Sequence, residues 1–249
     1  MAAEFLTRVN TTSAQGEKSA FIDLRQWAAS VPRQQPAGDA YLTARGALPL
    51  DPGPVEVSVV DLSGTGAVEA LAADELLMVL DGDLTVTWSN GALRLLSDQC
   101  AVIPKGSDFQ WACSTPSRVI VMSHASELPG VGEPVMIDEE GERAPSSPPA
   151  AEALVGSQPT THNRVDYLSA NKEFMCGVWD ATPYQRKPTL RRDYEFIKMI
   201  EGGTILGDST GQEQSFAAGD VMLMIMGGTA TWLSDRYVKK VYGTFRSLA

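Results

Sequence analysis

Histidine is nearly absent from this chain of 249 residues, which contains only His124 and His162. Cysteine is also scarce: Cys100, Cys113 and Cys176 are odd in number and have no CxxC spacing. This pattern favours reduced thiols and a cytoplasmic location over a disulfide framework. A first-row transition metal usually needs several imidazole, thiolate or carboxylate donors at one point, and the chain offers few of the first two.

Long apolar runs and positive charge are lacking as well. No stretch of 18 apolar residues occurs, so we expect no membrane span. Residues 1–8 lack a basic region followed by an apolar one, so we expect no secretory signal. Lys and Arg number 20 against 31 Asp and Glu, which gives a net charge of −11. Such an acidic chain is not expected to bind nucleic acid.

One spacing pattern occurs twice in the chain. It consists of Glu-x6-Gly followed by Gly-x4-Trp, and its members are Glu75, Gly82, Gly106 and Trp111 in the first half and Glu195, Gly202, Gly227 and Trp232 in the second. Short β-rich runs between Gly, Asp and Pro residues surround both copies, as is typical of a β-sandwich or barrel. The repeat predicts a duplicated β domain.

These motifs resemble those of the cupin family, whose first motif ends in Glu-x6-Gly and whose second reads Gly-Asp-x4-Pro-x-Gly followed by a His. Residues 174–245 are the most similar part, with Trp179-Asp180, Tyr194-Glu195 and Gly219-Asp220 in the order of the ureidoglycine aminohydrolase-type and ethanolamine-utilisation-type subfamily. The resemblance implies an all-β bicupin made of two RmlC-like jelly-roll (double-stranded β-helix) barrels.

The expected segments are an N-terminal arm (1–38), a first cupin barrel (39–127), a linker (128–160) and a second cupin barrel (161–249). The linker is acidic between Asp138 and Glu142 and then rich in Pro and Ser, a composition that disfavours a packed core. We prefer a flexible join, with the alternative that the acidic stretch covers the other barrel or a partner subunit. Outward apolar residues on cupin strands commonly pair two barrels, so the resemblance also implies a homodimer.

The usual metal ligands of the family are missing. Metal-binding cupins carry a His-x-His pair shortly before the motif Glu and another His three residues after the Gly of the second motif. Here residues 68–71 read Val-Glu-Ala-Leu, residues 188–191 read Pro-Thr-Leu-Arg, and the second-motif positions hold Phe109 and Ala230. We therefore expect no metal and no cofactor in either barrel, which disfavours a dioxygenase or oxidase.

Side chains alternate between the two faces of a strand, so Glu195 shares its face with Ile197 and Met199. The resemblance implies that this face is the barrel interior. A buried carboxylate without a partner is costly, so Glu195 should pair with a cation or take up a proton. Arg191 stands where a His ligand would lie, and its charge could replace that of the metal. A structural Glu–Arg pair without a ligand is the alternative.

The open pocket is predicted in the second barrel, because Ala230 leaves room where Phe109 fills the first barrel. Candidate ligand-binding residues are Glu195, Trp232, Arg191, Lys240, Tyr242, Tyr184 and Ala230. Both repeat tryptophans could instead be ordinary core. Glu75 has no Arg in the equivalent stretch, so it is expected to be structural or to face solvent.

Two functions remain open. The first is a metal-free bicupin that binds a small polar metabolite, a carboxylate or an amino compound, as a sensor or accessory protein. The alternative is a hydrolase or isomerase of nitrogen metabolism that resembles ureidoglycine aminohydrolase with a lost or replaced metal site. Acid–base chemistry would then rest on Glu195, Lys240 or a Tyr with a strongly shifted pKa, and we assign no catalytic residue.

Overall fold

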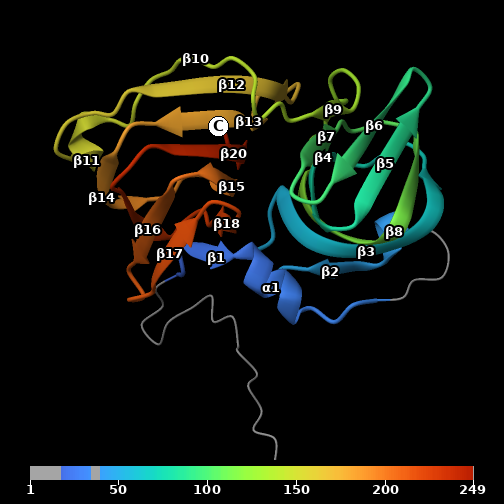
Figure 1. The fold of residues 1–249 in the computed structure, drawn as a ribbon, viewed down its shortest axis with the longest axis horizontal. Coiled ribbons are helices and arrows are strands. Elements are labelled where there is room, and N and C mark those ends of the chain that lie inside the picture. Colours follow the sequence, from blue (N-terminus) through green and yellow to red (C-terminus); the bar gives the residue numbers. More distant parts are fainter. Residues whose placement is uncertain (1–17, 35–39, 249) are drawn as a thin grey trace, which may run out of the picture.

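Two β-barrels lie side by side in the computed structural model, which describes residues 18–34 and 40–248 (Figure 1). The first barrel is drawn in cyan and green and the second in yellow to red, and the N-terminal segment in blue passes along both. The predicted all-β jelly-roll fold is confirmed. The expected lack of a secretory signal concerns residues outside the described part.

The first barrel is a single antiparallel sheet that curls on itself. Its strands are β2 (Arg45–Ala47), β3 (Val55–Val68), β4 (Asp74–Asp81), β5 (Asp83–Trp88), β6 (Gly91–Leu96), β7 (Cys100–Ile103), β8 (Phe109–His124) and β9 (Val135–Met136). The long strands β3 and β8 pair over most of their length, with a bulge between Leu62 and Gly64 that lets the sheet curve.

The second barrel consists of two antiparallel sheets. Its seven-stranded sheet has the order β1 (Phe21–Asp23), β18 (Val221–Met224), β15 (Tyr194–Glu201), β20 (Val238–Phe245), β13 (Phe174–Ala181), β12 (Thr161–Leu168) and β10 (Ala144–Pro145). Its five-stranded sheet has the order β11 (Leu154–Val155), β14 (Tyr184–Leu190), β19 (Thr229–Ser234), β16 (Gly203–Asp208) and β17 (Glu213–Ala217). The described helices are α1 (Leu24–Ser30), α2 (Ala40–Thr43) and the 3-10 turn η1 (Ala151–Ala153). None of them is long and apolar enough to cross a membrane.

The first-motif glycines make corresponding turns in the two barrels. Gly82 follows β4 with φ at 84°, and Gly202 follows β15 with φ at 78°. A Cβ atom would lie 2.3 Å from the Ser117 Oγ at the first position and 2.0 Å from the Tyr237 carbonyl oxygen at the second. Left-handed backbone and close packing both require glycine there, so the two motif strands end in the same way.

Each motif strand turns its glutamate face inward. Leu77 and Val79 on β4 lie in the core of the first barrel, and Ile197 and Met199 on β15 lie in the core of the second. The neighbouring residues of both strands point outward. The face predicted for Glu195 is therefore correct, whereas the alternative that Glu75 faces solvent is wrong, because Glu75 is 3 % exposed.

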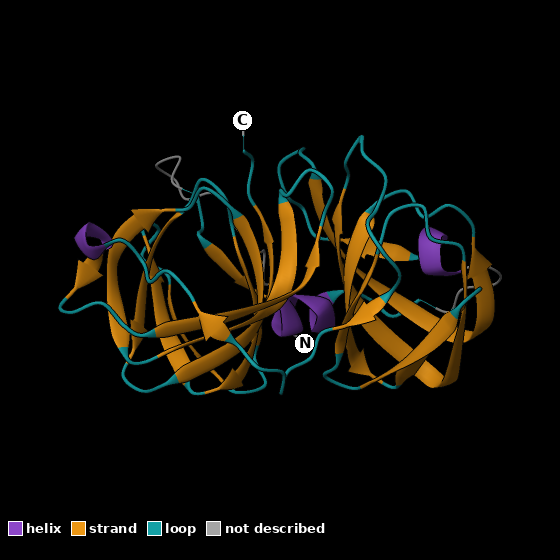
Figure 2. Ribbon diagram, turned by 90° about the horizontal axis from the view of Figure 1, so that it is seen from above, coloured by secondary structure: helices purple, strands orange, loops and turns teal. Residues whose placement is uncertain are grey.

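The outward faces form a third core between the barrels. Its members include Leu76, Met78, Val102 and Met122 from the first barrel, Phe196, Leu223, Val241 and Phe245 from the second, and Trp27 from α1. Helix α1 lies between the barrels (Figure 2). The apolar pairing expected of a homodimer is thus made within one chain, and the homodimer itself stays a prediction.

His124 belongs to this interface. It is fully buried at the end of β8 and packs against the rings of Phe174 and Phe245, with centroids 5.6 and 5.1 Å away. The Asn171 amide nitrogen lies 3.2 Å from its Nε2. His124 is therefore packed in the interface between the barrels and is not placed to bind a metal in either barrel.

The segment 128–160 packs against both barrels. Strand β9 pairs with β7 of the first barrel, whereas β10 and β11 pair with β12 and β14 of the second. Glu139 and Glu140 form ion pairs of 2.7 and 2.9 Å with Lys198 and Lys239. The acidic stretch therefore covers the second barrel, which was the alternative to a flexible join.

The shared core predicts that the barrels unfold together. Leu76 is 1 % exposed at the interface, so Leu76→Ala should lower the free energy of unfolding of the whole chain by about 2–5 kcal/mol. Leu96→Ala, at a residue that is 49 % exposed, should change it by less than about 0.5 kcal/mol. Guanidinium denaturation followed by tryptophan fluorescence measures both. Two separate transitions, only one of them shifted, would contradict a shared core.

Candidate functional site

A cavity of about 990 Å3 opens in the second barrel. Side chains from β13, β14, β15 and β20 line it, together with the loop after β14 and the residues that follow β20. Strand alternation determines which side chains reach the cavity. Those on inward-facing positions of β13 and β20 are Met175, Trp179, Lys240 and Tyr242.

Glu195 lies in the cavity between two cations. Its Oε2 accepts a hydrogen bond from the Arg191 guanidinium at 2.8 Å, and its Oε1 accepts one from the Lys240 ammonium at 2.7 Å. Burial raises the pKa of Glu195, but the charges of Lys240 and Arg191 outweigh it and hold the pKa at about 2. Burial also lowers the pKa of Lys240. The carboxylate is therefore ionised and fully paired at neutral pH.

Aromatic rings hold Lys240 in place. Its Nζ lies 4.9 Å from the ring centroid of Trp179 and 5.2 Å from that of Trp232, within the range of a cation–π contact. Tyr184 stacks on Trp232 with centroids 6.0 Å apart. The lysine thus has its position fixed by two rings and one carboxylate.

The ion pairs continue from Glu195 toward solvent. Asp193 is paired with Arg191 at 2.6 Å and with Arg246 at 2.6 Å. The Arg246 side chain is 63 % exposed, whereas that of Lys240 is 9 % exposed. The series Arg246, Asp193, Arg191, Glu195 and Lys240 alternates in sign, so each acid in it is neutralised by the chain itself.

Other polar groups of the lining have no such partner. Lys172, Arg186 and Arg192 line the cavity, and none of them forms an ion pair with an acid of the described residues. The Nε of Arg186 is buried without a hydrogen-bond partner, whereas the Tyr242 hydroxyl and the Asn163 side chain lie within hydrogen-bonding reach of each other. Unsatisfied buried polar atoms are uncommon in a folded protein, and a ligand is one explanation for them.

The lining is electropositive in an acidic chain. It contains six cationic side chains (Lys172, Arg186, Arg191, Arg192, Lys240 and Arg246) and three acidic ones (Glu173, Asp193 and Glu195). The whole chain carries a net charge of −11. The lining therefore holds twice as many cationic as acidic side chains.

Five of the seven candidate residues predicted from sequence line this cavity: Glu195, Arg191, Lys240, Tyr242 and Tyr184. Trp232 and Ala230 do not, because both belong to the hydrophobic core of the barrel. The Trp232 indole donates its hydrogen bond to Ser234, and Ala230 pairs with Thr189. The expectation that they line the pocket is therefore wrong. Trp232 only contacts two residues that do line it, Lys240 and Tyr184.

The sequence interpretation missed Trp179, Arg186 and Asn163. Arg186 lies two residues after Tyr184 on β14, so strand alternation could have placed it on the same face. Asn163 is on β12 opposite Trp179 of β13. No motif marked Asn163, because its position depends on the pairing of these two strands.

The equivalent glutamate of the first barrel is enclosed by its own chain. Glu75 is 3 % exposed, and both of its oxygens accept hydrogen bonds from Arg45, at 2.8 and 3.0 Å. The Tyr41 hydroxyl donates a third at 2.7 Å, and the Tyr41 ring packs edge-on against Phe109 at 5.3 Å. Glu75 thus has an arginine from β2, and Phe109 is buried as expected.

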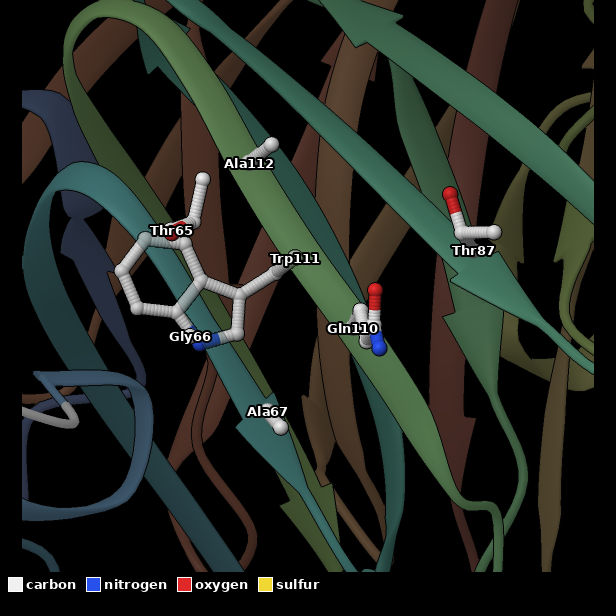
Figure 3. A pocket seen from close by; sticks show the side chains of 7 residues that line it. All are labelled: Thr65, Gly66, Ala67, Thr87, Gln110, Trp111 and Ala112. Atoms are coloured by element: carbon white, nitrogen blue, oxygen red, sulfur yellow. The ribbon is translucent and has the colours of Figure 1, made fainter.

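A cavity of about 410 Å3 lies on the first barrel (Figure 3), and Glu75 is not among the residues that line it. Its lining is Thr65, Gly66, Ala67, Thr87, Gln110, Trp111 and Ala112. The Trp111 ring lies against Gly66, where a Cβ atom would be 2.6 Å away. This lining has no charged side chain. Of these two cavities the larger is in the second barrel, where it was predicted, but the predicted reason is wrong because Ala230 does not line it.

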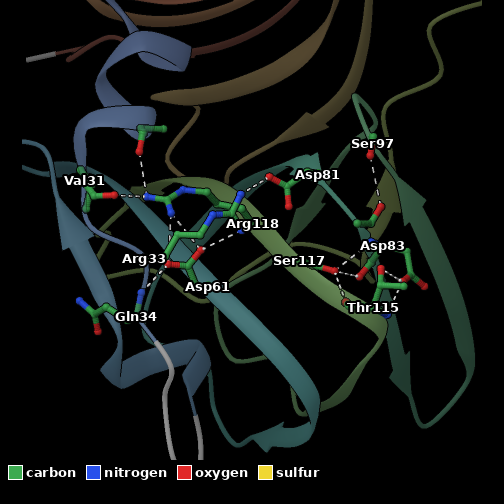
Figure 4. Close-up of polar contacts among 12 residues, drawn as sticks. Val31, Arg33, Gln34, Asp61, Asp81, Asp83, Ser97, Thr115, Ser117 and Arg118 are labelled. Atoms are coloured by element: carbon green, nitrogen blue, oxygen red, sulfur yellow. Dashed lines mark hydrogen bonds and ion pairs between the residues drawn. The ribbon is translucent and has the colours of Figure 1, made fainter.

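The second histidine lies outside the cavity. His162 Nδ1 is 2.9 Å from Asp180 Oδ1, and Arg143 also pairs with Asp180. Asp180 alternates with the inward-facing Trp179, so this His–Asp pair is on the outer face of the sheet. Asp61 of the first barrel is held in a similar way by Arg118, which also donates to the Val31 carbonyl (Figure 4).

The donors at Glu195 do not fit the divalent metal that a cupin barrel commonly holds. No cluster of three His, Cys, Asp or Glu side chains suited to a metal occurs in residues 18–34 and 40–248. Both Glu195 oxygens already accept hydrogen bonds from cations, and a metal there would meet two positive charges at close range. We therefore derive no chemistry through a metal.

Comparison with known proteins identifies the class of domain. Residues 168–242 match the family model of the EutQ-like cupin domain, so this part of the chain is a cupin-type domain. The search of curated proteins gave no significant match.

Solved structures share the fold over most of the chain. A protein of unknown function from the DUF861 family of Pseudomonas syringae pv. tomato is similar with a TM-score of 0.79 and 23% identity, covering 87% of this chain and 96% of that one. A cupin 2 conserved barrel domain protein from Leptotrichia buccalis has a TM-score of 0.57 and 9% identity, with 91% and 96% covered. The protein Ylba from E. coli has a TM-score of 0.55 and 11% identity, with 92% of each chain covered. Identities this low show the fold alone.

The paired Glu195 predicts an acid-sensitive contribution to stability. Its pKa in the folded state, about 2, lies below the ordinary value of 4.5, so its stabilisation is complete above about pH 5 and is lost as the pH falls toward 2. Glu195→Gln should lower the free energy of unfolding by about 3 kcal/mol at pH 7 and by less than about half of that near pH 3.

Urea denaturation at both pH values measures the difference. The matched control is Glu213→Gln on β17, where the carboxylate is exposed and forms no ion pair with the described residues. It should leave the stability nearly unchanged at both pH values. An equal loss for Glu195→Gln at pH 7 and pH 3 would show that the paired charge is not the cause.

Proposed function

We propose that the second barrel binds a small organic anion through a carboxylate group, without a metal, and that the protein acts as a sensor or accessory protein. The observation that carries this proposal is the charge of the cavity: six cationic and three acidic side chains line it in a chain of net charge −11. An excess of cations in a partly closed cavity raises the local concentration of anions.

The available donors favour a carboxylate over an amine. Arginine presents a planar fork that matches the two oxygens of a carboxylate, and Arg186 has a buried Nε without a partner. An amine would bring a further positive charge among six cations. Of the two ligand types expected from the sequence, the carboxylate is therefore the one that we propose.

The alternative of a hydrolase or isomerase receives no specific support. It required a lost or replaced metal site with acid–base chemistry at Glu195, Lys240 or a Tyr. Glu195 and Lys240 are paired with each other, and burial raises the pKa of Tyr184 and Tyr242 further from neutrality. We further infer that the two barrels arose by duplication, since Glu75 and Glu195 share a strand position followed by a left-handed glycine. A cytoplasmic location, favoured by three free cysteines, is part of the same proposal.

The proposal is tested by thermal shift with the carboxylates acetate, butanoate, hexanoate, succinate, glutarate and adipate, and with butylamine and putrescine. A ligand that binds only the folded state raises stability by RT ln(1 + [L]/Kd). We expect at least one carboxylate, and neither amine, to raise the melting temperature, with no change on adding EDTA.

Variants locate the site within the second barrel. Arg186→Met should remove the carboxylate-induced shift, since it removes a donor that has no other partner. Arg236→Met removes the same charge from a side chain that is 72% exposed outside the cavity, and should retain the shift. Stabilisation by the amines, or a carboxylate shift that survives Arg186→Met, would contradict the proposal.

A further inference from the structure

We infer that the ligand is a small dicarboxylate whose two carboxylates are held at two depths of the cavity in the second barrel. The inference rests on the proposed anion-binding function and adds the class of anion. It follows from which cations of the lining are already neutralised and from how deeply the others lie.

Part of the positive charge is already balanced by the chain. In the alternating series from Arg246 to Lys240, Asp193 and Glu195 are each shared by two cations at 2.6 to 2.8 Å. Glu173, the third acid of the lining, accepts hydrogen bonds from the Asn171 amide at 2.8 Å and the Leu248 backbone N–H at 3.0 Å. None of these acids pairs with the remaining cations.

The lining cations without an acidic partner differ in how deeply they are buried. Arg186 is partly buried, its Nε is enclosed, and its neighbours across the sheet are Leu154 and Trp232. Arg192 and Lys172 are exposed at the opening. A single carboxylate on the Arg186 fork has both oxygens occupied there. It leaves the charges at the opening without a partner.

The space inside the cavity suits a longer ligand. The volume of about 990 Å3 is at the upper end of the range for small-molecule sites, and so exceeds what a short monocarboxylate fills. The Tyr242 hydroxyl and the Asn163 side chain lie within hydrogen-bonding reach of each other, so the wall of the cavity there needs no polar group from the ligand.

The test compares acids of equal length by calorimetry on the full chain: succinate with butanoate, glutarate with pentanoate, and adipate with hexanoate. At least one diacid should bind about tenfold more tightly than its matched monoacid, since the second carboxylate adds charge-assisted hydrogen bonds. In the Lys172→Met/Arg192→Met double variant, the affinity for the diacid should fall to about that for its matched monoacid. Arg186→Met should weaken both classes.

Controls separate two sites from general electrostatics. Lys187→Met/Arg236→Met removes two exposed cations outside the lining and should retain the diacid preference. Equal affinity for diacids and monoacids, or inorganic phosphate binding as tightly as the best diacid, would overturn the inference and leave the anion proposal standing. Failure of every acid to bind would overturn both.

Discussion

Each barrel has a buried carboxylate at the same point of its fold, and other side chains must compensate its negative charge. Glu75 on β4 and Glu195 on β15 both point into a barrel interior. An ionised carboxylate in such surroundings costs several kcal/mol unless cations and hydrogen bonds compensate it. Cupins that bind a metal supply this charge from outside the chain, whereas both barrels here use side chains.

The side chains that compensate the glutamate come from different parts of the sequence in the two barrels. In the first barrel, Arg45 and Tyr41 come from the segment just before β3 and fill the space beside Glu75. In the second barrel, Arg191 precedes β15 and Lys240 is on β20. In the first barrel, an arginine and an aromatic ring fill the space beside the glutamate. The second leaves a cavity above the ion pairs, and this difference makes the second barrel the binding candidate.

Much of this could be predicted from the sequence, because strand alternation and motif spacing are local properties. Alternation predicts that Glu195 shares a face with Ile197 and Met199, and the resemblance to cupins adds that this face is the interior and that Arg191 lies near Glu195. What could not be predicted depends on pairing between distant strands. The Arg45–Glu75 contact joins residues 30 positions apart through the β2–β3 pairing, and Asn163 reaches the cavity only because β12 lies beside β13. Trp232 and Ala230 were placed in the lining because alternation gives the face of a side chain and not its depth.

The central claim is that positive side chains, and not a metal, balance Glu195. The most direct measurement is elemental analysis of the purified full chain, carried out on the wild type and on Glu195→Gln after growth with Fe, Mn, Zn and Ni supplied. Every one of these metals is expected to be far below one per chain in both proteins. Near-stoichiometric metal in the wild type that is lost in Glu195→Gln would contradict it.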